Sequence, residues 1–356
     1  MEEITLYYRE GSSDKIYQAS ISPRDGGYVV HFAYGRRGAT LQTGTKTQSP
    51  VTLEKARAIY DKLLNEKLGK GYTPGEDGTP YQHTGREQQA TGILPQLLNP
   101  IEDRDVQRFI YDPAYCAQEK FDGKRILIRK EDAAIDGINR RGLICGIPSL
   151  LVNEAREIPG NCVIDGESVG DVFFAFDILL IHGSDVRSQP YRDRLFALNQ
   201  IVSADFGFIK LADTALNLAE KAELLDKLRR ENREGVVFKN LSAAYVAGRP
   251  ASGGDNLKHK FYATASFIVN KLNGKRSVSL MLFDGQKVVP AGNVTIPPNH
   301  KIPVVGAVAE VRYLYAFRGG SIYQPVYLGV RSDITAEECT VAQLKYKAAE
   351  EDQAAA

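Results

Sequence analysis

The sequence has few cysteines, no long apolar run and almost no net charge, and each of these absences excludes a class of protein. The four cysteines form no C-x-x-C pair, which excludes a cysteine zinc site and a disulfide framework and indicates reduced core thiols at Cys116, Cys145, Cys162 and Cys339. No apolar run approaches the roughly 20 residues that span a bilayer, and residues 1–5 lack the features of a secretory signal. We therefore expect a soluble, cytoplasmic protein with no membrane association. Because 45 Lys and Arg residues balance 44 Asp and Glu residues, any basic surface must be local.

The length of 356 residues predicts two or three domains. Residues 1–75 predict a first module, in which short alternating segments over 4–34 form an antiparallel sheet. A helix follows, with Thr52 as its cap, apolar residues at helical spacing up to Leu64, and Gly69 as its stop. Residues 76–92 are rich in Pro, Gly, Thr and Gln without an apolar period, which predicts a linker.

The remainder of the chain predicts an α+β fold followed by a β-barrel. Within residues 93–260, apolar strands at 126–128, 172–180 and 235–238 alternate with helical stretches at 191–202 and 216–230. Residues 261–346 are predicted to form successive strands, with a turn at Asp284-Gly285 and a further strand over 307–316, which favours an OB-fold barrel. The charged, alanine-rich tail 347–356 is expected to fray.

The segment Lys120-Phe121-Asp122-Gly123-Lys124-Arg125 carries the first chemical signal. A turn here can present the Lys120 amine to a bound nucleotide, with Arg125 near its ribose and phosphates. Taken by itself, the same pattern also describes a solvated hairpin turn with flanking charges.

Four further segments follow in a fixed order on strand-like elements. They are Asp165-Gly166-Glu167, the strand Phe173–Leu179, Glu234–Lys239 and Leu257–Lys260. Together with the first segment they resemble motifs I, III, IIIa, IV and V of the covalent nucleotidyltransferase superfamily, which comprises ATP-dependent DNA ligases, RNA ligases and messenger-RNA capping enzymes. Asn139–Gly142 and Pro190–Leu195 are similar to features of DNA ligases, and the resemblance covers about residues 94–335.

The resemblance implies a role for each matching residue. Lys120 attacks the α-phosphorus of ATP, while Lys258 and Lys260, two residues apart on one strand face, stabilise the developing charge. The remaining roles are Asp122 beside the attacking group, Arg125 on the nucleotide, Glu167 and Glu234 on a divalent metal (Glu167 alternatively on the ribose), Phe176 stacked on adenine, Gln118 at the adenine edge and Arg140 on the 5′-phosphate of the break.

Structural interpretations exist for the same residues. Phe173, Phe174 and Phe176 suit a strand core, and Lys258 and Lys260 suit a solvated edge strand that resists aggregation. The ordered series of motifs favours the functional interpretation, because separate structural causes would all have to coincide with the order of one superfamily.

The barrel region resembles the carboxy-terminal OB domain of DNA ligases. Gln324–Asp333 is similar to the segment with motif VI, in which Arg331 faces pyrophosphate, although Ile334 stands where a lysine is frequent. The ordinary alternative is a strand with its terminal turn.

The first module resembles a WGR domain through Phe32-Ala33-Tyr34-Gly35-Arg36-Arg37-Gly38. The chain contains no tryptophan, and Tyr34 takes the place of the usual one. Because WGR domains contact DNA ends, Tyr34 and Arg36 are candidate DNA-binding residues. In the alternative interpretation, Tyr34 belongs to the core and Arg36 is a structural partner.

These resemblances predict a monomeric ATP-dependent DNA ligase that uses Mg²⁺ or Mn²⁺ and acts on nicked or broken duplex DNA. An RNA ligase or a mixed RNA/DNA ligase is the nearest alternative, and a break-binding scaffold with an inactive transferase is another. NAD⁺ as donor is disfavoured because cysteine clusters and helical-hairpin domains are missing, and capping is disfavoured by Asn139–Gly142 and Pro190–Leu195.

Overall fold

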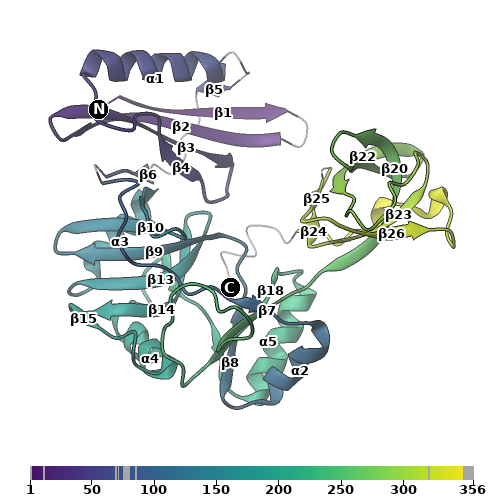
Figure 1. The fold of residues 1–356 in the computed structure, drawn as a ribbon. Coiled ribbons are helices and arrows are strands. Elements are labelled where there is room, and N and C mark those ends of the chain that lie inside the picture. Colours follow the sequence, from purple (N-terminus) through teal and green to yellow (C-terminus); the bar gives the residue numbers. More distant parts are fainter. Residues whose placement is uncertain are drawn as a thin grey trace. The chain divides into compact units, whose positions relative to one another are not determined.

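We describe the protein from a computed structural model, which places residues 2–10, 13–68, 70, 72–74, 81–84, 86–319 and 321–347 (Figure 1). These residues divide into two compact units: 2–224 with 237–258, and 225–236 with 259–347. Within them, no helix combines the length and the apolar character that a membrane span requires. All four cysteines are free and buried, as predicted.

An antiparallel sheet and one helix form the amino-terminal part of the first unit. The sheet has the order β4-β3-β2-β1-β5, with β1 Glu3–Glu10, β2 Ser13–Arg24, β3 Gly27–Arg36, β4 Gln42–Thr45 and β5 Thr73–Pro74. Helix α1, Leu53–Leu68, covers one face of this sheet (Figure 1). The Thr52 hydroxyl accepts a hydrogen bond from the Lys55 amide at 3.3 Å, which confirms the predicted cap. The predicted stop at Gly69 lies outside the described residues.

The apolar faces of the sheet and of α1 meet in one core. Leu6, Val30 and Ala56 are fully buried there, with Tyr60 and Leu63 from the helix beside them. Each fully buried large side chain contributes roughly 1.5–3 kcal/mol. The alternating strands and the helical period of the sequence therefore account for this module.

The stretch predicted as a linker contains one short strand in its described part. Strand β6, Tyr81–Gln82, pairs with β12, Ile147–Pro148, and the buried Tyr81 hydroxyl accepts a hydrogen bond from the Leu41 amide at 3.0 Å. Residues 75–80 and 85 lie outside the described part. Composition alone could not predict this pairing, because the partners of these residues lie far away in the sequence.

Two sheets make up the rest of the first unit. The larger has the order β11-β10-β9-β13-β14-β15, with β16 beside β14, and its strands are β9 Lys124–Glu131, β10 Ala134–Asn139, β11 Ile144–Cys145, β13 Cys162–Val169, β14 Val172–Ile181, β15 Ser184–Asp185 and β16 Ile209–Leu211. Helices α3, Ser149–Glu157, and α4, Tyr191–Ile201, contribute Leu151 and Leu198 to its core. The mixed α+β prediction is confirmed.

The second sheet has the order β17-β8-β18-β19-β7. Its strands are β7 Asn99–Pro100, β8 Tyr115–Glu119, β17 Thr214–Ala215, β18 Gly235–Asn240 and β19 Asn256–Lys260, with helices α2, Asp103–Tyr111, and α5, Leu218–Arg230. Helix α5 begins two residues later than predicted, because Asn217 acts as its cap: the Asn217 side chain accepts from the Glu220 amide at 3.0 Å.

The second unit contains an antiparallel sheet in the order β22-β21-β20-β23-β26. Its strands are β20 Ala263–Asn273, β21 Ser277–Asp284, β22 Lys287–Thr295, β23 Val308–Tyr313 and β26 Val326–Arg331; β24, Tyr315–Ala316, pairs with β25, Ile322–Tyr323, and two 3-10 turns, Ala336–Glu338 and Val341–Gln343, follow. The turn at Asp284-Gly285 is confirmed, whereas the strand predicted over 307–316 divides at Leu314. Within the described pairings β22 and β26 remain sheet edges, so closure into an OB barrel stays a prediction. The tail from residue 348 lies outside the described residues.

Candidate active site

The segment with Lys120 connects two different sheets. Strand β8 ends at Glu119 and β9 begins at Lys124, and these strands do not share a sheet. The hairpin interpretation of this segment is therefore wrong. Gly123 permits the crossing, because a Cβ at this position would lie 2.3 Å from the Ser168 carbonyl oxygen.

A pocket in the first unit brings together residues that are far apart in the sequence. Lys120 lines it beside Arg125, next to Glu167 from β13 and Lys258 from β19. Predicted site residues in the lining are Gln118, Lys120, Arg125, Arg140, Glu167, Phe176 and Lys258, and further lining residues include Gln96, Glu119, Asp177, Lys239, Tyr245, Arg249 and Asn256. Asp122 belongs to the same connection as Lys120 but not to this described lining.

Arg125 is held at the pocket by a buried carboxylate. Its Nη2 atom lies 2.6 Å from Oδ2 of Asp165, which also accepts a hydrogen bond from the Tyr245 hydroxyl at 2.7 Å. Burial opposes the charge on Arg125, but the Asp165 carboxylate more than offsets it and raises the pKa of the guanidinium. Arg125 is therefore a fixed cation, with its guanidinium 4.3 Å from the centre of the Phe176 ring.

The three phenylalanines of β14 lie on two different faces of the strand, because successive side chains alternate between its faces. Phe173 is fully buried in the core, which confirms the structural interpretation for this residue. Phe174 points to the opposite face and stacks on Phe121, with ring centres 4.2 Å apart. Phe176, on that same face, lines the pocket.

Lys239 is a pocket residue that the sequence analysis did not assign. Its ammonium lies 4.2 Å from the centre of the Phe176 ring and donates to the Phe176 carbonyl at 3.1 Å and to the Tyr191 hydroxyl at 3.2 Å. Burial lowers the pKa of Lys239 to about 8. The signal available in the sequence was its spacing from Val237, since residues two apart on a strand share a face and both line the pocket.

Gln118 and Tyr191 belong to one hydrogen-bond network. The Gln118 amide nitrogen donates to the Tyr191 hydroxyl at 3.0 Å and to Oγ1 of Thr214 at 2.7 Å, which uses both of its hydrogens. Tyr191 opens α4, and Arg194 in the same helix pairs with the pocket residue Asp177 at 2.8 Å. The segment Pro190–Leu195 therefore fixes α4 against the strand that carries Phe176.

Three predicted residues lie in the second unit. Glu234 is buried and pairs with Lys260 at 2.7 Å, and Lys260 also donates to Oε1 of Gln324 at 3.0 Å. Burial opposes the charge, yet the ion pair with Glu234 raises the pKa of Lys260. Arg331, at the end of β26, pairs with Asp333 and donates to Oγ of Ser266 at 3.3 Å.

Tyr34 and Arg36 lie two residues apart on β3, so their side chains share one face of the strand, and both are exposed. The Tyr34 side chain is 47% exposed and stacks against Tyr17, with ring centres 6.2 Å apart. The core interpretation of Tyr34 is therefore wrong. The two residues present an aromatic and a cationic group on the surface of this sheet.

Two family models match the chain. Residues 167–260 match the ATP dependent DNA ligase domain, and residues 3–79 match the WGR domain. The chain contains a DNA ligase domain. The matched range of that domain includes Glu167, Phe176 and Lys258, whereas Lys120 precedes it.

Relatives of this ligase domain are distant. DNA ligase 1 of Methanosarcina mazei is 23% identical over an alignment of 295 positions that covers 67% of this chain and 49% of that protein. The chain thus matches about half the length of this relative. A solved structure from an analysis of Lig E DNA ligases is 18% identical, with a TM-score of 0.51 over 67% of this chain and 99% of its own. The structure named Pmar-Lig_PreS3 is 15% identical, with a TM-score of 0.52 over 79% and 72%. These likenesses show a shared fold.

Proposed function

We propose that this chain is an ATP-dependent DNA ligase that joins 5′-phosphate and 3′-hydroxyl ends through an AMP carried on Lys120. The observation that supports it best is the shared pocket of Lys120, Arg140, Glu167 and Lys258, four residues that the motif series assigns independently of their positions in the fold. A bound nucleotide needs cations, a carboxylate and an aromatic face around one nucleophile, and the pocket supplies all four.

In the first step, the Lys120 amine attacks the α-phosphorus of ATP. A phosphorus–nitrogen bond forms, the bond to the bridging oxygen breaks, pyrophosphate leaves with the electron pair and the amine loses a proton. Lys258 stabilises the charge that develops on the α-phosphate. Phe176 provides a stacking face for adenine, and the Gln118 carbonyl, rather than its engaged nitrogen, accepts from the adenine amine.

Later steps use the substrate end of the pocket. AMP passes from Lys120 to a 5′-phosphate that Arg140 holds, and a 3′-hydroxyl then attacks that phosphate and releases AMP. Arg140 is exposed where it lines the pocket, which suits a residue that meets a macromolecular substrate. The roles of Asp122, Glu234, Lys260 and Arg331 remain predictions from the resemblance.

The lining also fits the divalent cation that the resemblance implies. Glu119 and Glu167 offer carboxylate oxygens, which Mg²⁺ and Mn²⁺ prefer. When bound, such a cation neutralises phosphate charge.

Covalent labelling tests this proposal. Incubation with α-labelled ATP followed by a denaturing gel should label the wild-type chain, and Lys120→Ala should abolish the label because the nucleophile is lost. The same variant should still seal a nick that already carries 5′-AMP. Lys62→Ala, at an exposed position of α1, is the matched control. A label that survives in Lys120→Ala refutes the assignment.

Nicks with ribose or deoxyribose on either side then distinguish the substrates. Preferential sealing of DNA supports the proposal, whereas preferential sealing of RNA favours the RNA ligase alternative. A chain that forms no adduct fits the scaffold alternative.

A further inference from the structure

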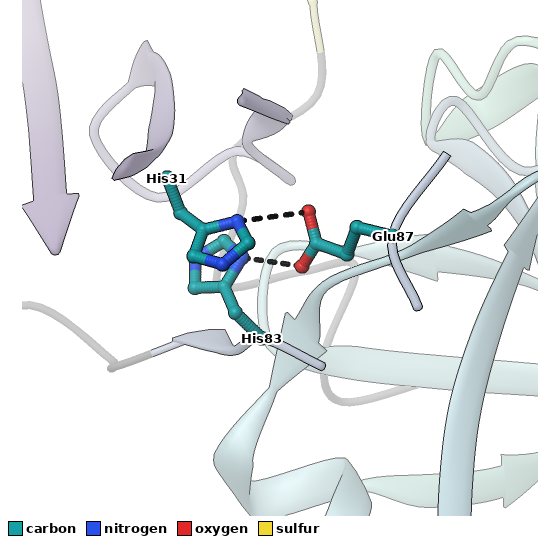
Figure 2. Close-up of side chains that lie close together, drawn as sticks. All are labelled: His31, His83 and Glu87. Carbon is teal, nitrogen blue, oxygen red and sulfur yellow. Dashed lines mark hydrogen bonds and ion pairs between the residues drawn. The ribbon is translucent and has the colours of Figure 1, made fainter. Parts of the chain in front are cut away.

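Two histidines and a glutamate meet in the interior (Figure 2), and none of them lines the Lys120 pocket. His31 comes from the middle of β3, His83 directly follows β6, and Glu87 lies in the next turn. The side chains of His31 and Glu87 are fully buried, and that of His83 is 8% exposed. Nothing in the proposed ligase reaction uses these three groups.

Hydrogen bonds alone do not satisfy this cluster. Nδ1 of His83 lies 2.6 Å from Oε1 of Glu87, but Nδ1 of His31 is 3.5 Å from Oε2, which is an ion-pair separation rather than a hydrogen bond. Among the described residues, both ring nitrogens of His31 and Oε2 of Glu87 have no hydrogen-bond partner. Buried polar atoms without partners destabilise a fold, and coordination of a metal ion would satisfy a His31 nitrogen and the Glu87 oxygen together.

The arrangement of the rings also disfavours the alternative in which protonated histidines alone balance the charge of Glu87. The two imidazole rings are stacked, with centres 4.7 Å apart and planes 14° from parallel. Protonating both rings would bury two stacked cations beside one carboxylate. A metal ion instead uses the lone pairs of neutral imidazoles, and its charge is offset by the carboxylate.

The donor set indicates which ion fits. One donor atom from each residue lies within 4.8 Å of the others, whereas a tetrahedral zinc site places its ligand atoms about 3.3 Å apart, so the two imidazole rings must turn out of their stacked arrangement to bind one ion. Two imidazoles and one carboxylate suit zinc(II), whereas Mg²⁺ and Ca²⁺ require oxygen-rich sites. Burial of the ligands suits a structural ion better than a redox centre that must meet a substrate.

We propose that His31, His83 and Glu87 bind a zinc(II) ion that stabilises the fold, with a water molecule as its fourth ligand. The ion ties β3 of the amino-terminal sheet to the segment that follows β6. That segment is bonded in turn to β11 of the larger sheet, because the Gln88 amide donates to the Ile144 carbonyl at 2.9 Å. This site stabilises the attachment of the WGR domain and is separate from the divalent cation of the ligase reaction.

Metal content of the full chain tests the proposal. The protein is stripped with a chelator, dialysed, reconstituted with zinc(II) without ATP or Mg²⁺, and analysed by elemental mass spectrometry. We expect one zinc per chain, a melting temperature at least about 3 °C above that of the stripped protein, and the absorption bands of four-coordinate cobalt(II) after reconstitution with that metal.

Variants identify the ligands. His83→Ala and Glu87→Gln should each lose the bound zinc, whereas His182→Asn should retain it, because His182 is exposed and asparagine tolerates its left-handed backbone at φ 48°. Failure of the wild type to bind zinc or to show the cobalt bands overturns the proposal, as does equal zinc in Glu87→Gln. If His83→Ala does not fold by circular dichroism, Glu87→Gln and the wild-type cobalt spectrum still decide.

Discussion

We expect Arg140 to separate nucleotide chemistry from substrate binding. It lines the pocket from an exposed position after β10, where a DNA phosphate has access. We expect Arg140→Ala to leave self-adenylylation within about twofold and to slow AMP transfer to the 5′-phosphate at least about tenfold, a loss of about 1.4 kcal/mol or more. Arg140→Lys should recover only part of the rate, since it lacks the bidentate fork.

The two half-reactions are measured separately, as labelled protein and as adenylylated DNA. An equal loss in both would instead place Arg140 in the nucleotide pocket or in the support of the fold.

Because Lys239 is buried, it should make the free energy of unfolding depend on pH. Burial lowers its pKa to about 8, below the roughly 10.4 of an exposed lysine. Between these values the unfolded chain holds a proton that the folded protein has released, so the free energy of unfolding rises with pH across this window. From pH 7 to pH 10, wild type should gain roughly 1–3 kcal/mol relative to Lys239→Met.

Urea unfolding of both proteins at the two pH values measures this gain. Titration of Lys345, whose pKa burial also lowers to about 8, is common to both proteins and cancels in the difference. A constant gap between wild type and variant would show that Lys239 does not titrate in this window.

At the scale of elements, the crossing from β8 to β9 decides where Lys120 lies. Gly123 packs against the backbone of β13, and an added Cβ would meet the Ser168 carbonyl oxygen at 2.3 Å and its carbon at 2.9 Å. Both atoms belong to a sheet and cannot move cheaply. Gly123→Ala should therefore displace the connection and reduce adenylylation of Lys120 by at least about tenfold, or about 1.4 kcal/mol.

Gly274→Ala is the matched control, because nothing lies within 4 Å of the Cβ it would add. Rates of label incorporation for the two variants provide the comparison. Normal labelling in Gly123→Ala would mean that the position of Lys120 tolerates movement of this connection.

Residues of β13 and β9 also contact the connection between β3 and β4 of the amino-terminal part. The Thr40 hydroxyl donates to the Ser168 carbonyl at 2.6 Å, and the Lys124 ammonium donates to the Leu41 carbonyl at 3.1 Å. Deleting residues 1–75 would therefore expose groups beside the Lys120 connection. Point substitutions on the exposed face of β3 separate DNA affinity from this packing.

At the scale of the whole molecule, we expect the WGR domain to add affinity for broken DNA without adding catalytic groups. Tyr34→Ala and Arg36→Ala should raise the KM for nicked DNA several-fold and leave kcat and self-adenylylation nearly unchanged. The loss from Arg36→Ala should diminish at high salt, because a phosphate contact is screened there. Since Tyr34 is 47% exposed, its loss should not lower the melting temperature.

Nick-sealing kinetics over a range of DNA concentrations, at two salt concentrations, test this expectation. Curves identical to those of wild type would mean that the exposed face of β3 serves a partner other than DNA.

Local sequence pattern determined many of the strands and helices of this protein. Alternation predicted β1, β2 and β3, helical spacing after a Thr cap predicted α1, and the helical pattern over residues 191–202 predicted α4. These signals suffice because each rests on neighbours within a few residues. The order of the motifs likewise selected Lys120, Glu167 and Lys258 as candidate site residues, and all three line one pocket.

Tertiary structure alone decided what depends on distant contacts. Only the fold shows that Lys120 lies between sheets, that Lys239 is buried against Phe176, and that Tyr81 and Glu87 are buried although the composition around them is typical of a linker. His31 and His83 are 52 positions apart on separate strand systems, so no spacing rule could join them to Glu87. The physical reason is that burial and donor geometry arise when elements pack, whereas sequence periodicity encodes only the element itself.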